Sequence, residues 1–121
     1  MAEGIRINLA DKLAQFHELW SPKIVDTVDD YEVKVVKIDG DFVWHQHAEA
    51  DELFIVLKGS LRMDFRDRQV SVGPGELIVV PKGVEHKPYA ERCEMILLER
   101  RGVANTGDGP ANERTVQPVR I

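Results

Sequence analysis

Hydrophobic residues recur with a helical period only near the start of the chain. The apolar stripe consists of Leu9, Leu13, Phe16 and Trp20. These positions are spaced i, i+4, i+7 and i+11, so they share one face of a helix. Asn8 is a suitable N-cap, and Pro22 cannot continue the helix beyond Ser21. We predict a helix over residues 8–19 that docks on the rest of the domain, with His17 off the stripe and solvated.

From residue 24 onward the pattern changes to short apolar or alternating runs separated by turn residues. The predicted strands are 24–28, 31–38, 42–47, 52–58, 60–66, 69–72, 77–80, 86–90 and 93–100. The turns between them include Asp39-Gly40, Lys58-Gly59-Ser60 and Gly73-Pro74-Gly75. Many short strands at regular spacing predict an all-β antiparallel barrel or sandwich.

Three of the predicted strands are apolar on both faces, over residues 54–57, 77–80 and 95–98. One face of each can line the barrel interior, but the other face also needs cover. A single short helix is too small to shield three such strands. A second subunit would supply the cover, so we predict a homodimer.

The chain has 121 residues, which is enough for one hydrophobic core and too short for two. We expect a single domain with an N-terminal helical segment over residues 1–23 and a barrel over 24–101. Residues 102–121 read as a loop, in which 116–121 forms an edge strand or lies across the partner subunit.

Composition excludes several classes of protein. The net charge of −5 and the absence of a Lys/Arg cluster argue against a nucleic-acid partner. No apolar run reaches the length of a membrane span, and the first residues lack the features of a secretory signal. The lone Cys93 has no partner for an internal disulfide, and we expect it to be packed and inert rather than reactive. These features predict a cytoplasmic protein that does not bind membranes.

Three of the four histidines fall in two short stretches together with one glutamate. On a strand His45 and His47 would point to the same side, roughly 7 Å apart. With Glu52 and His86 they offer three imidazoles and one carboxylate, which suit Fe(II), Mn, Co, Ni, Cu or Zn better than Mg or Ca. The competing interpretation is that hydrogen bonds in a polar barrel mouth satisfy these histidines.

The two stretches resemble the signature motifs of the cupin family. The positions that match the motifs are Gly40, His45, His47, Glu52 and Gly59 in the first, and Gly75, Pro81, Gly83 and His86 in the second. Two departures are Ala90, where the family usually has asparagine, and Gly40, which lies one residue closer to the first histidine than usual. Neither departure touches a ligand position.

The resemblance is to small single-domain cupins that often carry a phosphomannose-isomerase-like label. It implies a double-sheet jelly roll, a fold that commonly dimerises. It also implies that His45, His47, Glu52 and His86 bind one divalent ion inside the barrel, with Fe(II), Mn, Ni and Zn as the leading candidates.

Strand parity predicts what else surrounds the ion. The expected pocket-lining residues are Val43, Phe54, Val56, Met63 and Phe65. For each of them taken alone, a plain core role is the competing interpretation. Trp44 and Gln46 have the opposite parity, and so does Asp51, although Asp51 is a candidate to turn inward and hydrogen-bond a ligand. Tyr89 is a candidate proton donor at the rim of the pocket. The competing interpretation is that this tyrosine is merely solvated or packed.

These features favour a metal-dependent enzyme acting on a small oxygenated molecule. Oxygen-dependent cleavage and sugar-like isomerisation both fit, and the fold does not choose between them. The catalytic residues other than the metal remain unknown, because no titratable group besides the ligands stands out. That favours chemistry by the metal itself, such as O₂ activation, or a non-catalytic module that binds a metal or small molecule. A purely structural barrel leaves the four ligands without a role.

Overall fold

The computed structural model describes residues 3–121, so Met1 and Ala2 of the predicted 1–23 segment lie outside it. A short helix is followed by seven strands. In chain order these are α1 (Leu9–Leu13), β1 (Lys23–Val28), β2 (Tyr31–Asp41), β3 (Glu52–Phe65), β4 (Gln69–Val72), β5 (Leu77–Val80), β6 (His86–Arg100) and β7 (Val119–Arg120).

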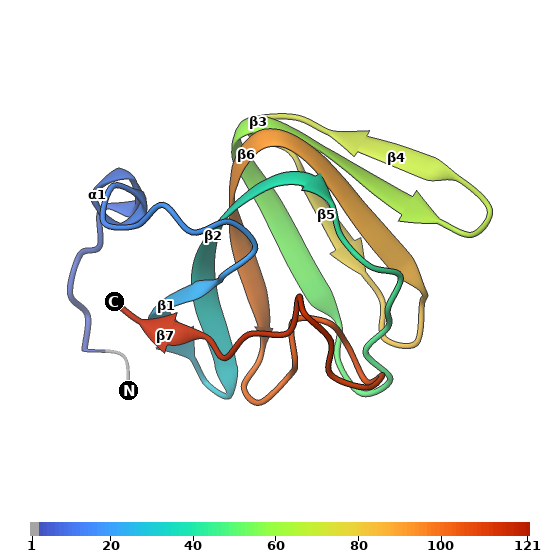
Figure 1. Ribbon diagram of the computed structural model, residues 1–121. Helices are drawn as coiled ribbons and strands as arrows, with labels where there is room; N and C mark the ends of the chain where they lie inside the picture. The colour runs from blue at the N-terminus through green and yellow to red at the C-terminus, as the bar shows by residue number, and fades with distance from the viewer. Residues whose placement is uncertain (1–2) are drawn as a thin grey trace.

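A long antiparallel ribbon of β3 and β6 forms the centre of the fold. Their register runs from Glu52 opposite Glu99 at one end to Phe65 opposite His86 at the other. The remaining strands extend this ribbon in the order β4-β3-β6-β2-β1-β7, and β5 pairs with the first half of β3. Figure 1 shows both long strands curving over at the top, so that each contributes to two facing layers.

The ribbon bends where glycine allows a close approach of the two backbones. Gly59 has a φ of 80°, and a Cβ atom built there would lie 2.1 Å from the carbonyl oxygen of Arg92. Arg92 also has a positive φ, of 45°, and the pairing register shifts on both sides of Lys58. The predicted turn at Lys58-Gly59-Ser60 is therefore wrong, because β3 continues through it. The predicted strands 86–90 and 93–100 are likewise one strand, β6.

Side chains on the inner faces of both layers form the main core. This core includes Val36, Ile38, Phe54, Val56, Leu61, Met63, Phe65, Met95 and Leu97. A smaller cluster of Leu13, Phe16, Val25 and Val35 lies under α1. The predicted all-β jelly-roll barrel with one short N-terminal helix is confirmed.

The N-terminal helix is shorter than the predicted 8–19. Asn8 caps it as expected, accepting a hydrogen bond from the Asp11 amide at 2.9 Å, but α1 ends at Leu13. Beyond it the chain follows β2, where Lys37 accepts the Trp20 amide at 2.8 Å and donates its ammonium to the Phe16 carbonyl. These tertiary bonds replace helical ones. His17 is exposed, as predicted.

The segment 42–47 is extended but is not a strand, contrary to prediction. Its ladder to β6 is reduced to one bridge between His45 and His86, together with a bond from the Phe42 amide to the Pro88 carbonyl. Pro88 has no amide to donate, so the ladder is interrupted there. The predicted alternation nevertheless holds, because His45 and His47 are buried while Trp44 and Gln46 are exposed.

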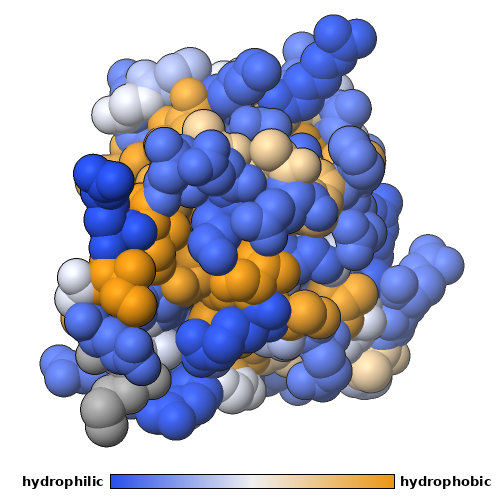
Figure 2. Space-filling model, turned by 90° about the vertical axis from the view of Figure 1, so that its left-hand side faces the viewer, coloured by the Kyte–Doolittle hydropathy of each residue, from blue (hydrophilic) through white to orange (hydrophobic). Residues whose placement is uncertain are grey.

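The C-terminal segment returns across the barrel to the first strand. The last strand β7 is only Val119–Arg120 and pairs in parallel with β1. Within residues 3–121, no helix is both long and apolar enough to cross a membrane. Figure 2 shows the side of the molecule that carries α1, β1 and β7, where hydrophobic patches are interrupted by hydrophilic residues.

Candidate metal centre

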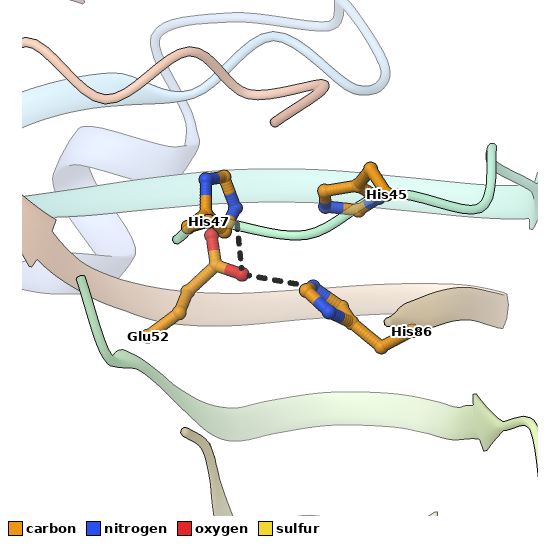
Figure 3. Close-up of side chains that lie close together, drawn as sticks. All are labelled: His45, His47, Glu52 and His86. Carbon is orange, nitrogen blue, oxygen red and sulfur yellow. Dashed lines mark hydrogen bonds and ion pairs between the residues drawn. The ribbon is translucent and has the colours of Figure 1, made fainter. Parts of the chain in front are cut away.

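The four predicted ligands converge on one point (Figure 3). His45 and His47 come from the extended segment 42–47, while Glu52 begins β3 and His86 begins β6. One ligand atom from each lies within 4.8 Å of all the others. Glu52 and His86 stand at opposite ends of the β3–β6 register, yet Glu52 Oε1 is 3.2 Å from His86 Nε2. The bend of the ribbon is what brings them together.

Two of the histidines are oriented in the same way. His45 and His86 exchange backbone hydrogen bonds of 3.0 and 2.9 Å. Each ring also places Nδ1 against the carbonyl two residues earlier, at 2.8 Å from Val43 and 2.9 Å from Val84. A carbonyl only accepts, so Nδ1 carries the proton in both rings. That leaves Nε2 as the atom of each ring that would bind a metal ion.

His47 differs from the other two histidines. It is 4% exposed, and neither ring nitrogen has a hydrogen-bond partner among residues 3–121. Glu52 Oε1 lies 3.4 Å from Nε2, an ion-pair contact that does not meet the geometry of a hydrogen bond. Leaving a buried polar group unpaired is costly, and a bound metal ion would remove that cost. Hydrogen bonding within the barrel therefore does not account for His47, and the donor set fits a metal ion.

The protonation states also suit a cation. Burial favours the neutral acid at Glu52, but contacts with His47, His86 and Glu99 outweigh it and hold the pKa well below the usual value. Burial, and next the neighbouring His86, lower the pKa of His45 to about 4. At neutral pH the site therefore holds a carboxylate and an uncharged His45, both ready to bind a metal ion.

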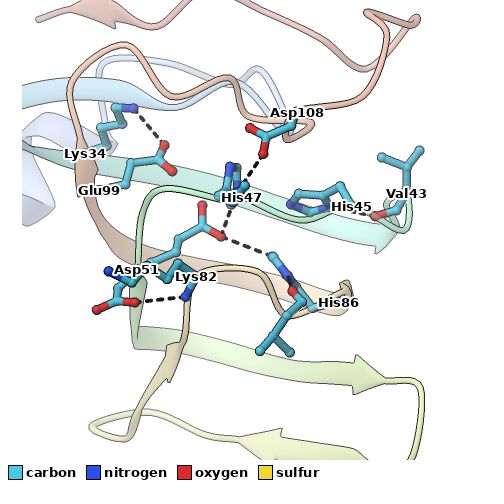
Figure 4. A network of polar contacts seen from close by, with 12 residues as sticks. Lys34, Val43, His45, His47, Asp51, Lys82, His86, Glu99 and Asp108 are labelled. Carbon is cyan, nitrogen blue, oxygen red and sulfur yellow. Dashed lines mark hydrogen bonds and ion pairs between the residues drawn. The ribbon is translucent and has the colours of Figure 1, made fainter.

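A buried ion pair lies behind Glu52, and reasoning from the sequence missed it (Figure 4). Lys34 Nζ is 2.8 Å from Glu99 Oε1 and 3.6 Å from Glu32 Oε1, and Glu99 is fully buried opposite Glu52 in the register. Burial and the Glu52 carboxylate raise the pKa of Glu99 well above its usual value. The alternation of side chains along the strands could have revealed this ion pair, because these charged residues share the inward face of β2 and β6 with Val36 and Leu97.

A small apolar cavity adjoins the ligands. Its volume is about 40 Å³, close to the space of one or two water molecules. The lining residues are Trp20, Pro22, Val36, Ile38, Phe42, His45, Glu52, Phe54, Pro88, Met95, Leu97 and Asn105. Trp20 stacks on Phe42, with ring centroids 4.7 Å apart, and Phe42 meets His45 edge-on. The wall next to the ligands is thus aromatic.

The other predicted pocket residues are placed in different surroundings. Phe54 lines the cavity, whereas Val56, Met63 and Phe65 pack in the main core. Val43 lines an outer hollow formed with the C-terminal segment. Trp20, Phe42, Pro88 and Asn105 line the cavity although parity did not predict them.

The two outlying candidates make contacts away from the ligands. Tyr89 lies on β6 opposite Arg62 of β3, whose guanidinium is 4.6 Å from its ring centroid. Asp51 is exposed and accepts the Lys82 amide at 2.9 Å, which ties the loop before His86 to the start of β3. Asp51 therefore acts on the backbone that carries the ligands, and no bond from it to a ligand side chain is present in the described part of the chain.

Comparison with known proteins agrees with this geometry. Residues 32–98 match the cupin domain family. The chain belongs to the cupin family. This cupin is 46% identical to a cupin-2 domain containing protein from Shewanella frigidimarina, with a TM-score of 0.74 over 78% of this chain and 92% of that one.

Two further comparisons place this cupin more broadly. It is 34% identical over 80 residues to the uncharacterized protein YdbB of Bacillus subtilis, which covers 65% of this cupin and 68% of YdbB. A hydroquinone 1,2-dioxygenase from Sphingomonas, with 4-hydroxybenzoate bound, has a TM-score of 0.68 at 20% identity. That match spans 84% of this cupin but 35% of the dioxygenase, and it shows a shared fold.

Proposed function

We propose that this protein binds one divalent metal ion through His45, His47, Glu52 and His86. The observation that carries the proposal is His47, a buried ring with no hydrogen-bond partner for either nitrogen and three other ligand atoms within 4.8 Å. Fe(II), Mn, Ni and Zn all fit three imidazoles and one carboxylate. Four protein ligands leave an open position on a five- or six-coordinate ion, which is where a substrate would bind.

We further propose that the ion supports an enzymatic reaction on a small oxygenated molecule. When bound, the metal would supply Lewis acidity or a site for O₂. Among the described residues that line the cavity, His45 and Glu52 are the ionisable ones, and both are ligands. A separate general base, which an isomerase or epimerase needs, is therefore not evident at the cavity. This favours dioxygenase-like chemistry over isomerase-like chemistry. It also argues against the isomerisation that the phosphomannose-isomerase-like label suggests.

The cavity supports a restricted substrate class. With about 40 Å³ of space and an apolar wall, it selects by shape and offers few polar contacts. Trp20, Phe42 and Phe54 would hold an apolar or aromatic portion of a substrate, while an oxygen atom of the substrate faces the ion. A molecule of aromatic size needs more room than the cavity provides, so the wall would have to move to admit it.

The alternative function is a non-catalytic module that binds a metal ion or a small ligand. The same absence of a separate acid or base among the described lining residues favours it. A metal-loaded protein that consumes neither O₂ nor any small oxygenated compound would identify this alternative.

The decisive experiment is elemental analysis of protein purified without chelators and without an affinity metal. We expect close to one ion per chain. Iron would support the oxygenase proposal, whereas zinc would support Lewis-acid chemistry or a non-catalytic role. Because the expression host influences metal content, anaerobic reconstitution with each metal is the control.

Ligand variants test the assignment of the site. His45→Ala and His86→Ala should each lose stoichiometric metal while keeping the barrel, because the main core does not include these side chains. Circular dichroism checks the fold, and elemental analysis checks the metal. Full occupancy in either folded variant would refute the site.

A further inference from the structure

The C-terminal segment contacts the stretch of chain that carries two of the ligands. Asp108 makes two backbone contacts there. Its Oδ2 accepts the Ala48 amide at 2.6 Å (Figure 4), and its own amide donates to the Gln46 carbonyl at 3.0 Å. Gln46 and Ala48 are the immediate neighbours of His47. Asp108, in the C-terminal segment, therefore holds the backbone on both sides of His47.

His47 depends on such contacts more than the other ligands do. Its ring makes no hydrogen bond, whereas His45 and His86 are each fixed by a bond from Nδ1 to a carbonyl. Its segment is also outside the regular sheet. The His47 backbone itself is held by the Gly83 amide, which donates to the His47 carbonyl at 2.9 Å. The position of the His47 ring thus follows from where these backbone contacts hold the chain.

The approach of Asp108 requires the glycine before it. Gly107 has a φ of 82°, and a Cβ there would lie 2.4 Å from the Gln46 carbonyl oxygen and 2.9 Å from His45 Cβ. Only glycine allows the two backbones to lie this close. The preceding residues are also held in place, because Asn105 donates to the Arg114 carbonyl at 2.7 Å and accepts the Val116 amide at 3.0 Å.

We infer that Asp108 is a positioning residue for His47, and that the segment around Gly107 and Asp108 is part of the metal centre. This inference rests on the proposed metal binding and adds a determinant of its affinity. Without the Asp108 carboxylate, the Ala48 amide loses its acceptor and the His47 backbone is free to shift. The ring then spends less time in the geometry that binds the ion.

Metal titration of three variants tests the inference. The probe is Zn²⁺ alone, measured by competition with a chromophoric chelator at a temperature where every variant is folded. Asp108→Ala should weaken Zn²⁺ binding by about 10-fold or more, the range typical of residues that orient ligands. Asp108→Asn keeps an oxygen that accepts from Ala48, so it should retain most of the affinity. Gly107→Ala should weaken binding as well, because it displaces Gln46.

The matched control is Glu76→Ala. The Glu76 carboxylate also accepts a backbone amide, that of Gly73 at 2.7 Å, in the exposed turn between β4 and β5. We expect its Zn²⁺ affinity to equal that of the unaltered protein. A second measurement on metal-free protein is amide hydrogen exchange at Ala48, which should become faster in Asp108→Ala and not in Glu76→Ala.

The outcomes separate this inference from the proposed function. If the unaltered protein binds one ion and Asp108→Ala binds it equally well, Asp108 has no positioning role and metal binding stands. If Glu76→Ala weakens binding as much as Asp108→Ala, the effect is one of general stability and the inference fails. If the unaltered protein binds no Zn²⁺, the proposed function and this inference both fall.

Discussion

Glu99 shows how one buried carboxyl can serve both stability and the ligand beside it. It forms the inner half of an ion pair with Lys34, whose side chain is 2% exposed, and it lies next to Glu52. A charge that is buried with its partner is tolerated, but a charge that loses its partner is strongly destabilising. Lys34 and Glu99 should therefore be replaceable together and not singly.

We predict that Glu99→Leu lowers the free energy of unfolding by about 3 kcal/mol, because it leaves Lys34 with only the more distant Glu32. Adding Lys34→Met should recover most of that loss, since the buried charge is then gone. Glu99→Gln should cost less than Glu99→Leu, because its amide oxygen can still accept from Lys34 although the negative charge is lost. Urea denaturation of the two single variants and the double variant measures this coupling. Additive losses in the double variant would contradict it.

Among single residues, the sequence predicts some members of the candidate site well and misses others completely. The four candidate ligands cluster as the sequence predicts, because their spacing survives loss of the strand: extended backbone alternates faces with or without a ladder. Glu99 and Asp108 were missed for different reasons. Glu99 looked like an ordinary strand charge, and Asp108 lies 60 residues from the amide that it binds. Contacts across such separations depend on the fold and leave no local pattern.

At the scale of elements, the bend in the β3–β6 ribbon determines the site. Lys58-Gly59-Ser60 has the composition of a turn, and the sequence alone predicts one. The chain instead continues because β6 runs beside β3 across the bend, a pairing between distant segments. The helix was overestimated for a related reason. Its apolar stripe is real, but Trp20 belongs to the main core while Leu13 and Phe16 belong to the smaller cluster.

We predict that Gly59→Ala lowers the free energy of unfolding by at least about 2 kcal/mol, because a left-handed conformation and a clash with the Arg92 carbonyl add together. Gly102→Ala is the matched control. Gly102 has a φ of 86° but nothing within 4 Å of a built Cβ, so this variant isolates the conformational cost. It should lose about 1 kcal/mol. Thermal denaturation of both proteins compares them, and equal losses would show that the close approach at Gly59 is unimportant.

At the scale of the whole molecule, one outer face carries apolar residues that residues 3–121 leave uncovered. Leu77 is 57% exposed and Val79 is 44% exposed, and they stand opposite Ile55 and Leu53 on β3. Ile96 and Leu98 of β6 continue the same face in register. A contiguous apolar surface of this kind is typical of a protein interface. We therefore propose that the homodimer expected from the doubly apolar strands forms through this face.

We predict a mass in solution of twice the 13.7 kDa chain, measured by light scattering at micromolar concentration. Leu77→Glu should shift the protein to a monomer, because it would bury a carboxylate in the interface. Leu19→Glu is the control, since Leu19 is 52% exposed on a different part of the surface, and it should remain dimeric. A monomer mass for the unaltered protein would refute the interface.

The folded-over ribbon has a consequence for how the barrel holds together. Glu52 and His86 come from opposite ends of one strand pair, so the side chains of this site join the two ends of the ribbon. A bound ion would act as a reversible cross-link between those ends. Its concentration would set the melting temperature by mass action. Depletion of metal in the cell would then lower the melting temperature of a barrel that stays folded, and the stability lost would be that of the two ribbon ends, away from the bend.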